Sequence, residues 1–177
     1  MEKNIHVKML TVISIICFLV IQWVKPEITI FANIGQTVSI TILIWGLYRK
    51  WLWKFNVFSN YPKLKKCYKG SFISDYDKKN RDVTIKIKQT LTSINVYYET
   101  QESFSKSISS QIYKDNFSYI IGYLYLNEPD QKIRNRSQIH YGYIQLVIDG
   151  ENLKGKYFTD RKTAGEIVLK PHYSATD

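Results

Sequence analysis

Two long apolar stretches begin the chain, and a short polar link separates them. Residues 7–24 are mostly apolar with Lys8 at their edge, and residues 28–48 contain no charged side chain. An α-helix needs about 20 mostly apolar residues to cross the hydrocarbon core of a bilayer. Both stretches therefore predict transmembrane helices, and the link Lys25-Pro26-Glu27 is short enough to join them as a hairpin.

A cleaved signal peptide is the alternative interpretation of the first stretch. The stretch has a basic start, but it lacks a clear small-x-small cleavage pattern, and a second apolar stretch follows at once. The pattern therefore favours a two-helix transmembrane hairpin over residues 1–54, followed by a basic juxtamembrane linker over residues 55–67.

From residue 68 onward the pattern changes to the alternation typical of β-strands. Residues 82–88 place three β-branched apolar side chains on one face and polar side chains on the other. The dipeptide Asp149-Gly150 is a hairpin signal, because glycine accepts the positive φ that such turns require. Strands are predicted over residues 68–74, 82–89, 91–99, 103–113, 117–126, 140–149, 152–159 and 164–170.

Eight consecutive antiparallel strands with short links favour an up-and-down β-barrel, because closure of the sheet removes exposed strand edges. A β-sandwich is the alternative. The predicted fold is therefore two N-terminal transmembrane α-helices followed by an all-β domain over residues 68–177, an eight-stranded antiparallel up-and-down β-barrel. Strands rich in Tyr and Phe favour a barrel filled by its own side chains.

The net charge of +10 is distributed unevenly. Residues 1–66 contain nine Lys and Arg but two acidic residues, whereas residues 67–177 contain sixteen and thirteen. Because the basic excess lies beside the apolar stretches and not on the strand-rich part, the pattern argues against a domain that binds DNA or RNA. By the positive-inside rule we expect a multi-pass protein of the bacterial inner membrane with both termini in the cytoplasm.

Cysteine usage agrees with that placement. Cys17 and Cys67 lie in different kinds of sequence and neither belongs to a CxxC pair. Two such cysteines indicate free thiols in a reducing compartment.

The second apolar stretch is unusually polar for a membrane span. Asn33, Gln36 and Thr37 lie within little more than one helical turn, and polar groups in lipid must find hydrogen-bonding partners. The partners could belong to the first helix of the same chain or to a second chain, which would give an oligomer in the membrane. Both interpretations remain open, and these three residues are the candidates for membrane assembly.

In a simple meander, four of the links between strands lie at the end of the barrel away from the membrane. These links are longer and richer in charge than the others, and loops on a rigid scaffold commonly form binding sites. The predicted links are residues 75–81, 100–102, 127–139 and 160–163.

The last of these links belongs to the segment KYFTDRKTAGEIVL, residues 156–169. By strand alternation Tyr157, Thr159 and Arg161 share one side. An arginine fork and a threonine hydroxyl can bind phosphate, and an aromatic ring can stack a base. The alternative is an ordinary surface arginine paired with Asp160 or Glu166.

No enzyme motif occurs in the sequence. The patterns GxSxG, HExxH and the phosphate-binding P-loop are absent, and the three histidines are scattered. We therefore expect a protein that is not an enzyme, with no catalytic residues, no metal site and no cofactor.

The two spans, the basic juxtamembrane stretch and the ending G-x-Y-F-T-x-R-x-T-x-G-x-I-x-L together resemble one family. This family is the CD-NTase-associated, two-transmembrane, β-strand-rich effectors of bacterial cyclic-oligonucleotide-based anti-phage signalling (CBASS). The ending corresponds to these residues of the chain: Gly155, Tyr157, Phe158, Thr159, Arg161, Thr163, Gly165, Ile167 and Leu169.

The resemblance implies a cytosolic barrel that binds a cyclic dinucleotide made by a CD-NTase as its activating ligand. It makes Thr159, Arg161 and Thr163 ligand candidates together with Tyr157. It also implies that the bound protein self-associates, that its helices disrupt the lipid bilayer of the inner membrane, and that the infected cell dies.

Two rival functions remain at this point. A membrane-tethered, lipocalin-like carrier would hold a small apolar ligand inside the barrel. A structural protein would anchor a partner protein to the membrane.

Overall fold

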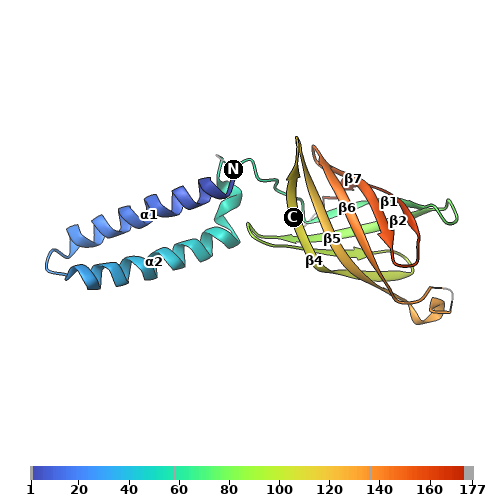
Figure 1. The fold of residues 1–177 in the computed structure, drawn as a ribbon, viewed down its shortest axis with the longest axis horizontal. Coiled ribbons are helices and arrows are strands. Elements are labelled where there is room, and N and C mark those ends of the chain that lie inside the picture. The colour runs from blue at the N-terminus through green and yellow to red at the C-terminus, as the bar shows by residue number, and fades with distance from the viewer. Residues whose placement is uncertain (1, 58, 136, 174–177) are drawn as a thin grey trace. The chain divides into compact units, whose positions relative to one another are not determined.

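The computed structural model describes residues 2–57, 59–135 and 137–173, and the chain divides into two compact units. The first unit extends to Lys63 and the second begins at Leu64. Figure 1 shows the helices of the first unit and the strands of the second.

The first unit is a hairpin of two antiparallel helices. Helix α1 spans Glu2–Val24 and helix α2 spans Ile30–Lys50, and the two pack against each other along their lengths (Figure 1). Thr29 caps α2, because its hydroxyl accepts a hydrogen bond from the Ala32 amide at 3.4 Å. A 3₁₀ turn, Leu52–Phe55, follows α2. Both helices are long and apolar enough to cross a membrane, as the hydrophobic pattern predicts.

The second unit is a closed antiparallel barrel. Each strand pairs with the next in the sequence, and β8 pairs with β1 to close the sheet. The prediction of an up-and-down barrel is confirmed. Within the described residues its strands are β1 Cys67–Ser74, β2 Asn80–Gln89, β3 Ile94–Glu99, β4 Ser103–Asp115, β5 Ser118–Pro129, β6 His140–Asp149, β7 Asn152–Thr159 and β8 Ala164–Pro171.

The order of the strands places the links between them at two ends. Residues 90–93, 116–117 and 150–151 lie at the end where the chain enters the barrel. The remaining links, residues 75–79, 100–102, 130–139 and 160–163, lie at the opposite end. We call this opposite end the far mouth, and it contains the four links that the sequence assigns to it.

The inner half nearer the entry end is filled by apolar side chains. Those that are at most 1% exposed are Ile85, Val96, Ile121, Ile144, Leu146, Leu153, Ile167 and Leu169. Because an eight-stranded barrel is just wide enough for side chains to fill, this layer occupies the space that an apolar ligand would need. The packing counts against the lipocalin-like carrier.

The pairing of β3 with β4 is interrupted, and serine hydroxyls bridge the interruption. The regular β3–β4 ladder ends at the pair Tyr97–Lys106. Just beyond it β4 bulges, because its register with β5 shifts between Ser107 and Ser109. Ser107 Oγ accepts a hydrogen bond from the Val96 amide at 3.0 Å, and Ser110 Oγ donates to the Ile94 carbonyl. These hydroxyls satisfy backbone groups that the regular ladder would otherwise leave without partners.

Two glycines stand where neighbouring strands approach most closely. A Cβ atom on Gly155 would overlap the Gln145 carbonyl oxygen in β6, and one on Gly70 would overlap the Val168 carbonyl oxygen in β8. Backbone atoms cannot move aside as the end of a side chain can. Gly155, the first glycine of the motif G-x-Y-F-T-x-R-x-T-x-G-x-I-x-L, is therefore explained by strand packing.

We predict that Gly155→Ala lowers the free energy of unfolding of the barrel by about 1–3 kcal/mol, because the methyl group must displace backbone. Gly122→Ala is the matched control, since its methyl group would meet the Tyr143 hydroxyl and the Tyr113 ring, which can rotate away. Urea denaturation followed by circular dichroism measures both. Equal losses in the two variants would contradict the explanation.

Candidate functional site

Aromatic side chains form a layer inside the far mouth. Tyr98 and Phe72 have ring centroids 6.1 Å apart, and Phe72 and Tyr157 have centroids 5.8 Å apart with an edge-to-face geometry. Tyr125 stacks on Tyr98 with centroids 6.3 Å apart. Four strands, β1, β3, β5 and β7, thus contribute one ring each to a continuous aromatic surface.

Glycines on adjacent strands make room for two of these rings. Gly165 is the β8 partner of Tyr157, and Gly142 is the β6 partner of Tyr125. A Cβ atom at either glycine would overlap the neighbouring phenol ring, and one at Gly165 would also overlap the Ile73 carbonyl oxygen in β1. The second glycine of the C-terminal motif therefore allows the Tyr157 ring to lie against the barrel wall.

Arg81 projects inward from the start of β2 and joins this layer. Its guanidinium lies 5.9 Å from the centroid of Phe72. It donates two hydrogen bonds to the Asp77 carboxylate in the β1–β2 link, one of them from Nη1 to Oδ1 at 3.0 Å. Arg81 is thereby held at the far mouth over an aromatic ring, in a half-buried position.

The Arg81–Asp77 pair changes the acidity of both groups. The hydrogen bonds from Arg81 lower the pKa of Asp77 to about 2, and the same bonds raise the pKa of Arg81. Because the unperturbed carboxyl already titrates near pH 4, Asp77 is ionised throughout the neutral range and competes with any other anion for the guanidinium.

The tyrosines of the layer carry no charge at neutral pH. Burial is the main cause that raises the pKa of Tyr98, Tyr125 and Tyr157, and for Tyr157 a hydrogen bond with Ser74 and the charge of Arg81 oppose it. These phenols can therefore contribute ring surfaces and neutral hydrogen bonds, but not negative charge.

Buried polar groups lie beside the aromatic layer. Ser105 Oγ donates to Asn127 Oδ1 at 2.7 Å, and both side chains are buried on the inner faces of β4 and β5. The Tyr123 hydroxyl is also buried and makes no hydrogen bond with the described residues. A buried polar atom of this kind is a natural partner for a small polar molecule.

Thr159 and Thr163 close the β7–β8 turn. Their hydroxyl oxygens lie 2.6 Å apart, and the Thr159 amide donates to the Thr163 carbonyl at 3.0 Å. Thr100 and Ser103 close the β3–β4 turn with hydroxyls 3.0 Å apart. The two motif threonines are half-buried, and they have a structural role in this turn independent of any ligand.

Arg161 lies on the rim and not on the inner face of β7. The strand ends at Thr159, so the alternation predicted for Tyr157 and Thr159 does not extend to Arg161, and that prediction is wrong. Arg161 Nη1 donates to Ser137 Oγ at 3.2 Å, which joins the β7–β8 turn to the β5–β6 link.

The structure also contradicts the alternative in which Arg161 pairs with a neighbouring acid. Within the described residues Arg161 forms no ion pair with Asp160 or Glu166. Asp160 instead uses its Oδ2 to accept a hydrogen bond from the Tyr141 amide at 3.1 Å. The exposed guanidinium of Arg161 is therefore not neutralised by the acids next to it.

The sequence interpretation did not single out Arg81, although a signal was present. Arg81 has the same strand parity as Val83, Ile85 and Ile87, whose side chains point inward. An inward arginine at the mouth end of a strand is unusual, because charged side chains are seldom buried without a partner. The inward position of residue 81 in the strand alternation could therefore have identified Arg81 as a candidate site residue.

The polar residues of α2 separate into two groups. Asn33 is fully buried against α1, where its Nδ2 donates to Gln22 Oε1 at 2.8 Å and to the Phe18 carbonyl at 3.3 Å. Thr37 is also buried and donates to Asn33 Oδ1 at 3.3 Å. Both residues thus hold the hairpin together within one chain.

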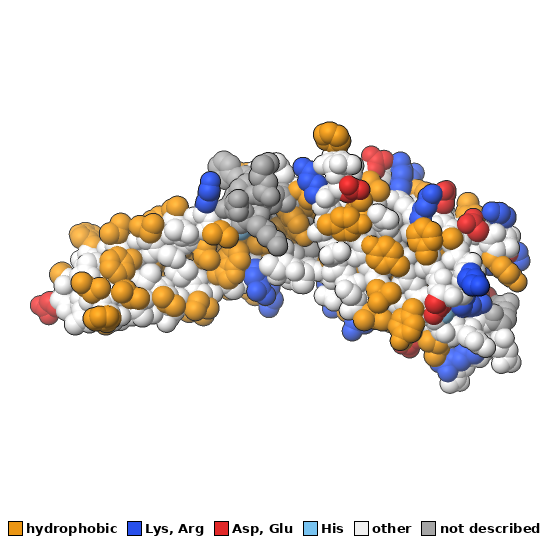
Figure 2. Space-filling model, in the orientation of Figure 1, with side chains coloured by type: hydrophobic (Ala, Val, Ile, Leu, Met, Phe, Trp, Pro, Cys, Tyr) orange, Lys and Arg blue, Asp and Glu red, His pale blue; other side chains and the backbone are white. Residues whose placement is uncertain are grey.

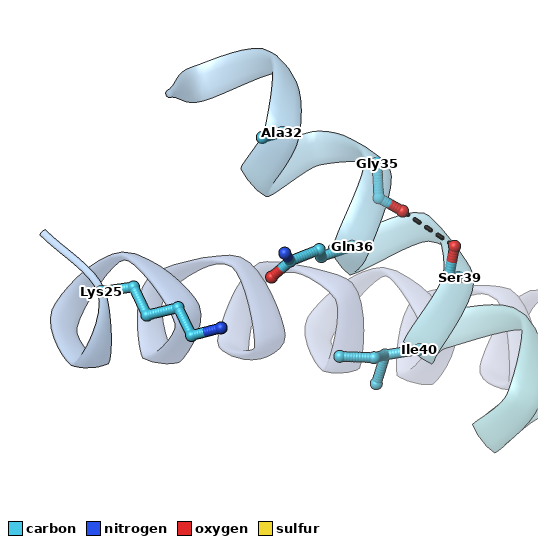
Figure 3. A pocket seen from close by; sticks show the side chains of 6 residues that line it. All are labelled: Lys25, Ala32, Gly35, Gln36, Ser39 and Ile40. Carbon is cyan, nitrogen blue, oxygen red and sulfur yellow. Dashed lines mark hydrogen bonds between the residues drawn. The ribbon is translucent and has the colours of Figure 1, made fainter. Parts of the chain in front are cut away.

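Gln36 lies on another face of α2. Its side chain is exposed, and it makes no hydrogen bond with the described residues. It borders a shallow hollow of about 520 Å³ that Ala32, Gly35, Ser39, Ile40 and Lys25 also line (Figure 3). The Ser39 hydroxyl donates to the Gly35 carbonyl of its own helix at 3.0 Å, so the Gln36 amide and the Lys25 ammonium are the polar side-chain groups left available there among the described residues.

The described residues contain no group of three or more His, Cys, Asp or Glu that could hold a metal ion. The far mouth brings together guanidinium groups, neutral phenols, hydroxyls and a side-chain amide, beside the Asp77 carboxylate. This combination suits an anionic ligand that also has flat rings.

Comparison with known proteins agrees with that chemistry. The family model described as Cap15, cyclic dinucleotide receptor domain, matches residues 59–171. The chain is also 26% identical over 164 residues to CD-NTase-associated protein 15 of Staphylococcus schleiferi, and the alignment covers 90% of each chain. Because the family match includes every strand of the barrel and more than half of the chain, this chain belongs to the Cap15 family of cyclic dinucleotide receptors.

Proposed function

We propose that this chain is a membrane-anchored effector of CBASS anti-phage defence, which binds a cyclic dinucleotide at the far mouth of its barrel, oligomerises and disrupts the bacterial inner membrane. The observation that carries the proposal is the inward Arg81, held over Phe72 beside a layer of tyrosine rings. The family match supports the ligand class, and the two apolar helices support the membrane.

The ligand's two chemical features fit two features of the mouth. A cyclic dinucleotide has two phosphodiester groups and two bases. A guanidinium fork binds phosphate oxygens through two parallel hydrogen bonds, which Arg81 now makes with Asp77. Aromatic rings stack bases irrespective of their identity. We assign the bases to the mouth tyrosines, including Tyr157.

Arg161, Thr159 and Thr163 complete the proposed site at the rim. Arg161 is exposed, and its hydrogen-bonding partner within the described residues is the neutral hydroxyl of Ser137. It can therefore reach the second phosphate without first leaving a carboxylate. The threonines hold the turn that presents it, and their half-buried hydroxyls can add donors to the same phosphate.

The Arg81–Asp77 pair gives binding a structural consequence. A phosphate that takes over the Arg81 guanidinium must displace the Asp77 carboxylate, and Asp77 belongs to the β1–β2 link. Binding would therefore release that link from the barrel wall. A ligand shifts the protein toward an assembled state only if it binds that state more tightly than the resting state. We propose that the β1–β2 link, released in the assembled state, accounts for the difference in affinity.

In the membrane, Gln36 is our candidate for contact between chains. Asn33 and Thr37 are satisfied within the hairpin, and we propose that they contribute by fixing the orientation of α2. An exposed amide in hydrocarbon gains from a hydrogen bond with another chain, typically by about 1 kcal/mol. The small residues beside Gln36 would allow a second helix to approach closely.

The placement of both termini in the cytoplasm is part of the same proposal. Basic residues occur from Arg49, in the last turn of α2, onward, whereas the link between the helices contains one lysine, Lys25, and one acid, Glu27. The positive-inside rule then places the barrel on the cytoplasmic side, where a nucleotide made in the cell can reach it.

We predict that Arg81→Ala and Arg161→Ala each weaken nucleotide binding by roughly 10- to 100-fold, because each removes a charge-assisted hydrogen bond to phosphate. Isothermal titration calorimetry of the barrel against a panel of 3′,3′-linked purine and pyrimidine cyclic dinucleotides measures the effect. Lys132→Ala is the matched control at the same end of the barrel. Unchanged affinity in both arginine variants would refute the site.

Asp77→Asn tests directly whether the Asp77 carboxylate competes with the ligand phosphate for the Arg81 guanidinium. The amide keeps the shape of the carboxylate but loses its charge, so Arg81 is freed and we expect tighter binding of the same nucleotides in the same titration. Weaker binding in this variant would mean that Asp77 supports the ligand and does not compete with it.

For the helices, we predict that Gln36→Leu in the full chain reduces killing of cells that also produce the nucleotide, while the affinity of the barrel stays unchanged. Chemical cross-linking in membranes should show loss of the oligomer. Ser39→Ala is the control, because the Ser39 hydroxyl is satisfied by its own helix. Full killing and full cross-linking by Gln36→Leu would exclude this residue from assembly.

A further inference from the structure

A groove on the outer wall of the barrel runs from the entry end to the outer rim of the far mouth, where Thr100 and Gln101 line it. It has a volume of about 960 Å³ and runs over β1, β2, β3 and the start of β4. Lys66, Lys69, Lys86, Lys88, Tyr97 and Phe104 are among the residues that line it. The inward arginine and the aromatic layer of the mouth are not part of this surface.

Several lysines on this wall form no ion pair with the described residues. Lys69 in β1 stands directly opposite Lys170 in β8, and like charges in opposed positions destabilise a sheet. Within the described residues no ion pair involves Lys69, Lys170, Lys88 or Lys106. Lys86 is the exception, because it lies 3.1 Å from Glu99.

Two lysines near the entry end of the barrel are paired with carboxylates. Lys65 lies 3.0 Å from Glu151, and Lys154 lies 2.8 Å from Asp149. The groove itself is lined by four lysines and two acidic residues, Asp82 and Glu99, which leaves a net positive charge on this wall. A wall that keeps such charge is complementary to an anionic partner.

An aromatic ring occupies the centre of the charged wall. The Nζ atoms of Lys88 and Lys106 lie 5.8 Å and 6.0 Å from the Tyr97 ring centroid, and Lys86 is its cross-strand partner in β2. Phe104 is 46% exposed beside it, with ring centroids 6.3 Å apart. Basic side chains around exposed aromatic rings are typical of surfaces that bind to lipid headgroups.

The groove begins at the end of the barrel where the chain enters. Lys66, Cys67 and His172 lie there, at the start of β1 and just after β8. Leu64, the first residue of the barrel unit, comes 14 residues after α2 ends at Lys50. Fully extended, that segment spans roughly 45–50 Å, which is the upper limit that the chain sets on the separation of Leu64 from the end of α2.

We infer that this groove binds the phosphate groups of anionic phospholipids in the membrane that α1 and α2 enter. Each lysine near an anionic membrane surface adds to the attraction, which falls off within about 10 Å. This contact would give the barrel a preferred face toward the bilayer. The inference goes beyond the proposed function and rests only on its placement of the helices in a membrane.

The chemistry favours a membrane surface over a second nucleotide site. The cations named around the groove are all lysines, which act as mobile point charges, whereas the far mouth offers arginines with a fixed fork. Mobile charges suit a fluid array of headgroups. A fixed fork suits one phosphate in one orientation.

The test is co-sedimentation of the barrel, residues 64–173, with vesicles of phosphatidylcholine alone or with one quarter phosphatidylglycerol. The barrel closes on itself and buries its own core, so it is suited to separate study. We expect binding to the anionic vesicles alone, and we expect it to weaken with salt. Replacing Lys69, Lys88 and Lys106 with Gln should reduce partitioning by on the order of a hundredfold.

A second triple variant controls for net charge. Lys79, Lys132 and Lys156 are exposed and do not line the groove, and their replacement with Gln removes the same charge. Partitioning should fall less than tenfold in this variant. Equal losses in the two triple variants, or no binding of the wild-type barrel to anionic vesicles, would overturn the inference.

Two further arms separate the lipid surface from soluble phosphates. Glycerol phosphate at millimolar concentration should not displace the barrel from vesicles, and complete displacement would indicate a site for a free phosphate compound. The groove variant should keep its calorimetric affinity for cyclic dinucleotides. Loss of that affinity, with Arg81→Ala and Arg161→Ala unaffected, would move the nucleotide to the groove and contradict both proposals.

Discussion

The pairing of β8 with β1 is the constraint on which the rest of the structure depends. It closes eight strands into a barrel whose inner half near the entry end is filled by apolar side chains. Because that half is filled, the interior at the far mouth is where polar groups and rings can gather. Closure also brings the turn of residues 160–163 to the same end as the β1–β2 link, although 80 residues of sequence separate them.

At the far mouth, Arg81 is the group through which binding of a phosphate would move the β1–β2 link. Arg81 is held by a carboxylate from a link and rests on a ring from the barrel wall. The pair survives at neutral pH because Asp77 stays ionised. An incoming phosphate therefore meets a guanidinium that is already oriented, and it must break the hold on the link to use it. Binding of the phosphate to Arg81 and release of the β1–β2 link would then occur in the same step.

The fold could be predicted closely because its signals are local. Alternation in residues 82–88 and the turn at Gly150 need no knowledge of the rest of the chain, and the predicted strand bounds lie within three residues of those observed. The partners of Arg81 could not be predicted, because they depend on the register in which Phe72 faces Arg81. Alternation also stops where a strand ends, so the pattern that places Tyr157 and Thr159 on one face of β7 does not place Arg161.

The helices show the same division between local and spatial information. The sequence marks Asn33, Gln36 and Thr37 as polar residues in an apolar span, but the direction of α1 decides which of them are used within the hairpin. The outer lysines are similar, since their charges are visible in the sequence but their opposed positions, such as Lys69 with Lys170, come from strand pairing. Figure 2 shows the outcome, with apolar side chains covering the helical unit and charged ones spread over the barrel.

The most direct test of the central claim is a titration of isotopically labelled barrel with cyclic dinucleotides, followed by nuclear magnetic resonance. Arg81 Nε–Hε and the backbone amides of residues 75–79 and 160–163 report on the mouth, and the amide of Tyr97 reports on the outer wall. The account predicts that the largest shifts occur at Arg81 and in the two links. Shifts confined to the outer wall, or no shifts with any nucleotide tested, would contradict it.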